Sequence, residues 1–322
     1  MTEMIAPRPP RSTIRAVRFH RFGEPAEVLQ LDEAAVPAPR PNRIRVVVHA
    51  CGLNPADWAL CRKLYDMELP RGIGLDVSGT VDALGEGVTD VAVGDRVLGF
   101  ADFATYPSAG ASDVAVLDHW AKVPPGLDMS LAAALPMAAL IGQHAVDALE
   151  MKPGQRLLVH GGGSMMGFSA VQIARARGFE VLTTAGSTYA DELRAFGATV
   201  TQYGEGMVER VRALGPVDLV LDTVGGALPD LIRIVDGEPK RVLSIADRSG
   251  PELGVRGNYD GGRPLRYEAF AEMAREAAAG RFFIPIARTF PLEHWREAMV
   301  ISTSGKASGK LLLMPSASPS SG

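Results

Sequence analysis

The fold is decided by the stretch RLLVHGGGSMMGFSAVQIARARG, residues 156–178. Residues 157–160 have the unbroken apolar character of a buried strand, three glycines follow, and an amphipathic helical pattern begins near Gly167. Strand, glycine turn and helix in this order suit a dinucleotide phosphate. Glycines let the backbone approach a pyrophosphate, and a helix N-terminus presents unpaired N–H groups. We therefore expect a dinucleotide site at this turn.

The turn departs from the strict G-x-G-x-x-G pattern, which would require glycine at Met166. It fits a looser frame from Gly161 to Gly167, with Ser164 and Met165 where small residues usually stand. A tight turn that only packs the strand against the helix is the alternative interpretation. The predicted cofactor contacts in this segment are Gly161, Gly163, Ser164, Met165, Met166 and Gly167.

The second strand of this region, residues 180–185, indicates which dinucleotide is bound. An Asp or Glu usually stands at the end of that strand and holds the 2′-hydroxyl of NAD, whereas this chain reads Thr-Ala-Gly-Ser from Thr184 to Ser187. Without a carboxylate to repel a 2′-phosphate, and with two hydroxyl donors, the sequence favours NADPH. Tyr203 is a candidate to stack on or hydrogen-bond the adenosine end, and a surface aromatic is the alternative.

From Gln155 onward, strand and helix patterns alternate, which predicts a parallel sheet wrapped by crossover helices. The alternating segments are RLLVHG, MGFSAVQIARARG, EVLTTAG, ADELRAFGA, VDLVLDTVG and KRVLSIA. A helix over residues 266–279 follows, and FFIPIARTFPL, HWREAMVIS and GKLLLM then supply strand, helix and strand. The predicted fold class is α/β, with a doubly wound parallel sheet of the Rossmann type.

The first half of the chain has a different pattern. Residues 14–123 are short β-rich runs separated by Gly and Pro, which is typical of a compact, mostly antiparallel β domain. A helical stretch at 130–150 follows, which Asp128 or Ser130 can cap and Pro136 breaks or kinks. We expect a β domain at 14–129, a cofactor-binding domain at 130–283, a return segment at 284–315 that completes the first domain, and disordered tails at 1–13 and 316–322.

Composition excludes several classes of protein. The 322 residues are 47% hydrophobic, and 33 basic against 37 acidic side chains give a net charge of −4. This balance argues against a disordered chain and against nucleic-acid binding, which would need clustered Lys and Arg. The two cysteines, Cys51 and Cys61, cannot build a disulfide framework, so we expect a reduced, cytoplasmic setting. The longest apolar run, 131–141, is too short to span a bilayer, and we expect no export signal.

Several motifs in one order make the chain resemble a known superfamily. They are GLNPADW at 52–58, GLDVSGTV at 74–81, VGDRV at 93–97, KPGQRLLVHGG at 152–162, LDTVGG at 221–226 and SGKLLLM at 308–314. The sequence is similar to the medium-chain dehydrogenase/reductases, and within them to the zinc-independent quinone oxidoreductases. The resemblance implies a GroES-like β domain, a Rossmann domain and reduction of small quinones or conjugated enones by NADPH.

The resemblance also bears on zinc. The zinc enzymes of this superfamily carry a His-Glu pair where this chain reads Leu75-Asp76, and a lobe of four closely spaced cysteines that this sequence lacks. A catalytic zinc needs three protein ligands, and Cys51 with Asp76 would lack the histidine. We expect no metal, with Cys51 a buried strand residue and Asp76 a structural carboxylate.

Three departures from the family pattern keep other functions open. Ser164-Met165 replaces the usual glycine pair, Ile141-Gly142 replaces the Thr-Ala that lies beside the nicotinamide, and Gln143 replaces a frequent aromatic. The alternative to a reductase is a cyclase or isomerase of specialised metabolism without net redox turnover, and a non-catalytic scaffold is a third interpretation. The remaining predicted cofactor contacts are Ile141 and Ser244.

Hydride transfer is the chemistry of the cofactor, so the chain has to position the substrate, polarise its carbonyl and exclude water. Asn54 is the first candidate to hydrogen-bond the substrate oxygen or orient the nicotinamide, and an Asx turn before Pro55 is the alternative. Tyr65 is a candidate proton donor or a cover for the pocket mouth. Tyr259 lies in a glycine-rich segment that can close over a ligand, and a plain flexible connection is the alternative.

Superfamily members commonly dimerise through the edge of the Rossmann sheet. We expect the Val- and Leu-rich strand at 241–246 to be such an edge strand, which can pair in this way. The resemblance therefore implies a homodimer.

Overall fold

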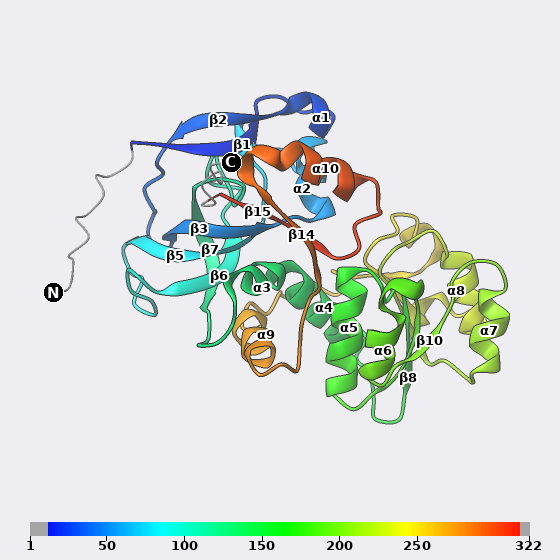
Figure 1. Ribbon diagram of the computed structural model, residues 1–322. Coiled ribbons are helices and arrows are strands. Elements are labelled where there is room, and N and C mark those ends of the chain that lie inside the picture. The colour runs from blue at the N-terminus through cyan, green and yellow to red at the C-terminus, as the bar shows by residue number, and fades with distance from the viewer. Residues whose placement is uncertain (1–11, 316–322) are drawn as a thin grey trace. The chain divides into compact units, whose positions relative to one another are not determined.

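The computed structural model describes residues 12–315, which divide into two compact units (Figure 1). Among these residues, unit 1 comprises those up to Lys122, Thr289–Lys306 and those from Leu311 onward. Unit 2 comprises Val123–Arg288 and Ala307–Lys310. The predicted tails lie almost wholly outside the described residues.

The chain passes from unit 1 to unit 2 after Lys122 and back after Arg288, close to the predicted bounds at 129 and 284. Asp128 caps the helix that begins at Met129, since its Oδ1 accepts from the backbone N–H of Ser130 at 2.8 Å. Gln172 exchanges two hydrogen bonds with the backbone of Phe283 and holds that segment in unit 2.

Unit 1 contains a six-stranded sheet in the order β14-β15-β3-β5-β6-β7 and a three-stranded sheet in the order β2-β1-β4. β3 also pairs with β7, so the larger sheet curls on itself, and the registers of β3, β5, β6 and β7 are antiparallel as predicted. The strands are β1 Thr13–Phe19, β2 Leu29–Ala35, β3 Ile44–Gly52, β4 Arg71–Gly72, β5 Asp76–Leu84, β6 Arg96–Ala101, β7 Val114–Lys122, β14 Ile286–Pro291 and β15 Lys310–Met314. The helices are α1 Pro25–Val28, α2 Pro55–Cys61 and α10 Trp295–Thr303.

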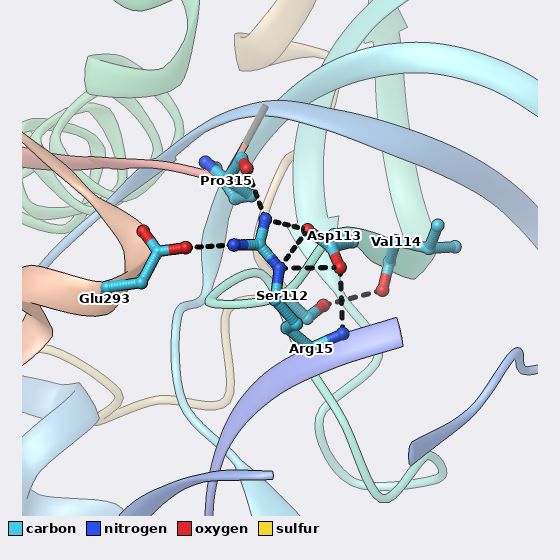
Figure 2. Close-up of polar contacts among 6 residues, drawn as sticks. All are labelled: Arg15, Ser112, Asp113, Val114, Glu293 and Pro315. Atoms are coloured by element: carbon cyan, nitrogen blue, oxygen red, sulfur yellow. Dashed lines mark hydrogen bonds and ion pairs between the residues drawn. The ribbon is translucent and has the colours of Figure 1, made fainter. Parts of the chain in front are cut away.

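Arg15 ties β1 to three other segments of unit 1 (Figure 2). Its side chain donates to Asp113 before β7, at 2.6 Å, and to the carbonyl oxygen of Pro315 at 2.7 Å. It also pairs with Glu293 in the returning segment. This cluster joins residues nearly 300 positions apart in sequence, so it fixes the return segment to the first strand of the chain.

Unit 2 is a six-stranded parallel sheet in the order β10-β9-β8-β11-β12-β13, wrapped by helices. The strands are β8 Arg156–His160, β9 Glu180–Thr184, β10 Thr199–Thr201, β11 Leu219–Asp222, β12 Val242–Ser244 and β13 Arg256–Gly257. The helices are α3 Met129–Ala134, α4 Pro136–Ala148, α5 Met165–Ala176, α6 Ala190–Ala195, α7 Met207–Ala213, α8 Leu228–Ile234 and α9 Ala269–Ala278. The predicted α/β class, with a Rossmann-type sheet, is confirmed.

The order of strands locates the site within unit 2. The chain builds outward from β8 to β9 and β10, and then returns to the other side of β8 with β11. In open parallel sheets, ligands bind outside the carboxyl ends of the strands at such a reversal. The turn after β8 lies at this point.

Short helices and an apolar cluster cover one face of this sheet. Leu158, Val220 and Val242 of the strands pack in one buried cluster with Val211 of α7 and Leu231 of α8. Neighbouring residues of a strand point to opposite faces of the sheet, so the residues between these positions point to the other face. On that face α5 packs against β8 and β9. Within residues 12–315, the helices lack the length and apolar character needed to cross a membrane.

One prediction about this sheet is wrong. The strand at 241–246 is not an edge, because β12 lies between β11 and β13, with Leu243 opposite Arg256 and Ser244 opposite Gly257. After β12 the chain leaves the sheet and returns to add the two-residue strand β13. So short a strand carries no periodic signal in the sequence. In the described chain, β10 and β13 form the edges of this sheet.

Candidate functional site

The glycines of the turn after β8 have two different roles. Gly161 has a positive φ of 85°, and a Cβ on Gly162 would lie 2.1 Å from Thr183 Oγ1. A Cβ on Gly167 would lie 2.3 Å from the carbonyl oxygen of Gly161. The protein's own packing requires glycine at these three positions. This is what the alternative interpretation expects, in which the turn packs the strand against the helix. A Cβ on Gly163 would meet no protein atom within 4 Å, so this position is the open one.

The first turn of α5 presents unpaired backbone donors. Ser164 caps the helix, and its Oγ accepts from the N–H of Gly167 at 3.0 Å. The N–H of Phe168 donates to the carbonyl oxygen of Ser164 at 2.7 Å. Within the described chain, the N–H groups of Met165 and Met166 have no hydrogen-bond partner. Two free donors therefore stand at the positive end of a 12-residue helix, beside open Gly163, and such a helix end favours an anion.

Buried side chains hold the turn from beneath. Thr184 is fully buried, and its Oγ1 accepts from the N–H of Gly161 at 3.1 Å and contacts His160 Nδ1 at 2.8 Å. The hydroxyl of Thr223 lies 2.8 Å from the carbonyl oxygen of His160 and 2.9 Å from Ser164 Oγ. Burial lowers the pKa of His160, opposed by the charge of Asp222, so the imidazole is neutral at neutral pH.

Asp222, at the end of β11, organises the neighbouring strand end. This fully buried carboxylate accepts from Ser244 Oγ at 2.7 Å and from the N–H of Gly225 at 2.9 Å. Ser244 Oγ in turn accepts from the N–H of Asp247 at 3.0 Å. Thr184 and Ser244 were predicted as ligand contacts, but their hydroxyls are occupied inside the protein, so we assign them to positioning the loops.

A cavity of about 440 Å³ lies at the carboxyl end of β9. Ser187, a predicted cofactor contact, lines it, and so do two arginines that the sequence analysis did not single out, Arg194 of α6 and Arg210 of α7. Arg194 pairs with Asp191 at 2.7 Å. The Nη atoms of Arg210 donate to the carbonyl oxygens of Glu205, Gln202 and Tyr203, and its buried Nε has no hydrogen-bond partner in the described residues. Both arginines lie in helices that follow the strands, several residues beyond the strand ends, so no short sequence motif connects them with the cavity.

Tyr203 lies beside this cavity. Its side chain is 60% exposed, and its hydroxyl is 3.8 Å from where a Cβ on Gly186 would stand. Gly186 itself lines the cavity. Tyr203 is therefore within reach of a ligand held there.

The unusual stretch at 141–143 is explained in part by helix packing. A Cβ on Gly142 would lie 2.6 Å from Ser169 Oγ, so glycine lets α4 approach α5. Ile141 is buried, and Gln143 donates to Glu272 Oε2 at 3.3 Å. Gly142 thus follows from a close helix contact and gives no evidence of altered chemistry.

In unit 1, Asn54 is held in place at the start of α2. Its Nδ2 donates to Asp76 Oδ2 at 3.1 Å, and its backbone N–H donates to Asp57 Oδ2 at 2.7 Å. Asp57 Oδ1 accepts from the N–H groups of Gly74 at 2.8 Å and Leu75 at 3.1 Å. Asn54 is therefore the helix cap, and this network sets the direction of its amide.

The two candidate tyrosines belong to different units, and each is mostly exposed. Tyr65 of unit 1 is 55% exposed, with its ring centroid 6.1 Å from that of Phe103. Tyr259 of unit 2 is 62% exposed, with its ring 5.6 Å from that of His144. His144 Nε2 contacts the carbonyl oxygen of Asn258 at 2.9 Å, which steadies the segment beside Tyr259.

Comparison with known proteins identifies the relatives of this chain. A family model for the alcohol dehydrogenase GroES-like domain matches residues 40–129, and one for zinc-binding dehydrogenases matches residues 196–313. The quinone oxidoreductase of Sus scrofa is 30% identical over 93% of this chain and 97% of its own length. The polyketide synthase system protein NorB of Streptomyces orinoci is 32% identical over 90% of this chain, which spans 14% of that protein.

A solved structure agrees with these matches. The quinone oxidoreductase of Coxiella burnetii superposes with a TM-score of 0.79 at 28% identity, covering 94% of this chain and 99% of that one. The predicted resemblance is confirmed.

The residues at the position of the superfamily's catalytic metal do not fit zinc, despite the name of the second matching model. Cys51 is fully buried, and its Sγ lies 2.4 Å from where a Cβ on Gly74 would stand. Asp76 is engaged by Asn54, and the residue between Gly74 and Asp76 is Leu75. In residues 12–315, no three His, Cys, Asp or Glu side chains gather as metal ligands.

Proposed function

Because the chain belongs to the medium-chain dehydrogenase/reductase superfamily, among its quinone oxidoreductase-like members, we propose that it is a metal-free, NADPH-dependent reductase of quinones or α,β-unsaturated carbonyl compounds. Membership makes it an oxidoreductase that uses a nicotinamide dinucleotide. The preference for NADPH and the substrate class are the proposal. The name of the Sus scrofa relative supports the quinone, and NorB, which is named as a polyketide synthase system protein, is our reason to keep the α,β-unsaturated carbonyl compounds in the proposal.

The observation that carries the proposal is the pair of unpaired N–H groups of Met165 and Met166 at the start of α5. They suit a diphosphate, because both donors stand at the positive end of the helix, and Gly163 leaves room for close approach. Met165 and Met166 are themselves only half-buried, so they do not fill the turn with core side chains.

The cavity at the end of β9 supports NADPH in particular. A 2′-phosphate is a dianion, and Arg194 and Arg210 offer guanidinium groups that bind phosphate oxygens with charge-assisted hydrogen bonds. Ser187 and Tyr203 add hydroxyls at the same place. NADH lacks the phosphate and would use neither arginine in this way.

When bound, the dinucleotide supplies the hydride. The chain's residues bind and orient: the amides of Met165 and Met166 hold the diphosphate, and the residues around the β9 cavity hold the adenosine end. We propose Asn54 as the donor to the substrate carbonyl, since its Nδ2 contact with the carbonyl oxygen of Gly52 is long, at 3.4 Å, and a substrate oxygen can take it over. Tyr65 and Tyr259 are proposed to cover the substrate and exclude water.

Calorimetry with each dinucleotide tests the proposal directly. We expect NADPH to bind with a Kd on the order of micromolar, near −8 kcal/mol, and NADH to bind more weakly. Absorbance assays with a panel of quinones and enones should then show net NADPH consumption. If neither dinucleotide binds, the proposal fails, and binding without consumption would favour the cyclase or isomerase, an alternative that the packing role of Gly142 weakens.

We further propose that the protein works in the cytoplasm as a homodimer. Both cysteines are free and buried, and burial together with the charge of Asp57 raises the pKa of the Cys61 thiol to about 12. Such a thiol is unreactive. If the Rossmann sheet mediates pairing, β10 or β13 has to provide the edge, and light scattering measures the oligomeric state.

A further inference from the structure

A second cavity, of about 670 Å³, lies within unit 1 and apart from the glycine turn. It is formed by three segments: the loop before β3, the loop between α2 and β4, and the segment after β6. Its lining residues are Arg40, Tyr65, Asp66, Met67, Glu68, Arg71, Phe103, Ala104 and Thr105. Apart from Tyr65, none of these residues has a part in the proposed reductase site.

Arg71, in β4, is the unusual residue of this cavity. Only 8% of its surface is exposed, its Nε is buried without a hydrogen bond, and no carboxylate among residues 12–315 pairs with its guanidinium. A guanidinium cannot lose its proton in a protein, so Arg71 keeps its charge. A buried N–H donor of a cationic group that has no partner is unfavourable, and such a group calls for an explanation.

The other arginines of unit 1 show what a structural role would look like. Arg15, Arg18, Arg43 and Arg45 are half-buried, and each pairs with an aspartate at 2.6–2.9 Å. Arg71 is more buried than any of these four, and it lacks such a partner.

The acidic residues of the cavity do not supply the missing charge. Asp66 is 86% exposed and lies 3.4 Å from Lys63 Nζ. Glu68 is exposed and forms no ion pair with any described residue. Within residues 12–315, therefore, no acidic side chain supplies a partner for Arg71.

Strand pairing and close packing fix the backbone of Arg71. β4 pairs with β1, where Arg71 stands opposite Phe19. At the next position, a Cβ on Gly72 would lie 2.5 Å from the backbone nitrogen of Ala109, so the strand is wedged between two neighbours. Arg71 is held at the cavity wall.

The rest of the wall is apolar and aromatic. The rings of Tyr65 and Phe103 lie 6.1 Å apart at 35°, and Met67 stands beside them. Flat apolar groups bind against such rings. The exposed Arg40 adds a second cation among the lining residues.

We propose that this cavity binds a small aromatic or conjugated carboxylate, whose charge pairs with Arg71 and whose flat body lies against Tyr65 and Phe103. A carboxylate matches the planar fork of a guanidinium and completes its hydrogen bonds. The proposal does not rest on the dinucleotide site, because every residue it uses lies in unit 1.

The test is calorimetry of the full-length protein with 2-naphthoate, its neutral analogue 2-naphthamide, and inorganic phosphate. We expect saturable binding of naphthoate, at least about tenfold weaker binding of naphthamide, and a similar loss for naphthoate in Arg71→Met, since a charge-assisted hydrogen bond is lost. Arg71→Lys should retain part of the affinity. Arg248→Met, which removes an exposed arginine of unit 2, should leave binding and NADPH affinity unchanged.

Thermal unfolding separates a binding role from a structural one. Without ligand, Arg71→Met should melt at the same temperature as the wild type or higher, because the variant removes an unpaired buried charge. Naphthoate should raise the melting temperature of the wild type alone. The proposal is overturned if naphthoate does not saturate, if naphthamide or phosphate binds as well as naphthoate, or if Arg71→Met melts several degrees lower and still binds naphthoate.

Discussion

The buried polar groups beneath the glycine turn and the buried arginine of unit 1 solve the same problem differently. His160, Asp222 and Ser244 find partners inside the protein, so their burial serves to hold loops in place. Arg71 finds none in the described chain. The comparison sets buried groups that are satisfied within the protein and hold its loops against a buried group that is not, to which we assign a ligand.

The largest effect should come from Gly167→Ala. The added Cβ would meet the carbonyl oxygen of Gly161, a backbone atom that cannot rotate away, so the turn itself has to shift. We expect the free energy of unfolding to fall by about 3 kcal/mol, which is the upper end for overpacking. We also expect the variant to lose most of its affinity for NADPH.

Gly163→Ala is the matched control for that variant. A methyl group there meets no protein atom, so denaturant unfolding should change by less than about 0.5 kcal/mol while NADPH affinity falls. Equal stabilities for the two variants would show that the glycines do not divide into packing and ligand-facing positions.

Asp222→Asn should rank next, and it tests the satisfied network directly. Asparagine keeps the shape but brings an N–H group toward Ser244 Oγ, which already accepts from Asp247. We expect a loss of about 2 kcal/mol in denaturant unfolding, because a buried charged acceptor is removed. Arg71→Met, in contrast, should not lower the free energy of unfolding. If Asp222→Asn leaves the free energy of unfolding unchanged, the distinction between the two regions is lost.

Arg194→Gln should separate the two dinucleotides. Loss of one charge-assisted hydrogen bond should weaken NADPH binding about tenfold, or 1.4 kcal/mol, and leave NADH binding unchanged. Arg212→Gln serves as the control. Arg212 lies in α7, two residues after Arg210, but it is not among the residues that line the cavity. Equal weakening of NADPH and NADH would mean that Arg194 does not face a 2′-phosphate.

The smallest effect concerns pH. Because the pKa of folded His160 lies below its ordinary value of 6.5, the unfolded chain takes up a proton that the folded chain refuses as the pH falls through that value. Stability is therefore complete above this range and declines toward acid, by at most about 1.4 kcal/mol per pH unit. Denaturant midpoints from pH 8 to about pH 5 measure the slope. His160→Gln should flatten it and the exposed His49→Gln should not; a slope that survives His160→Gln contradicts this origin.

Local patterns predicted much of the fold. The turn from Gly161 to Gly167 was recognised because its neighbours in space are also its neighbours in sequence. The same holds for Asp128 as a helix cap and for Pro136, which begins α4. The sequence analysis was wrong about the edge of the Rossmann sheet, because β13 is a two-residue strand whose existence depends on pairing with β12.

The amino-acid sequence alone determined the α/β class, the superfamily and the position of the glycine turn, since periodicity, glycine placement and motif order are properties of contiguous residues. Only the tertiary structure decided that Thr184 and Ser244 are buried supports, that Arg194 and Arg210 share a cavity, and that Arg71 lacks an ion pair. Each of these depends on residues that are distant in the chain and meet only after it folds.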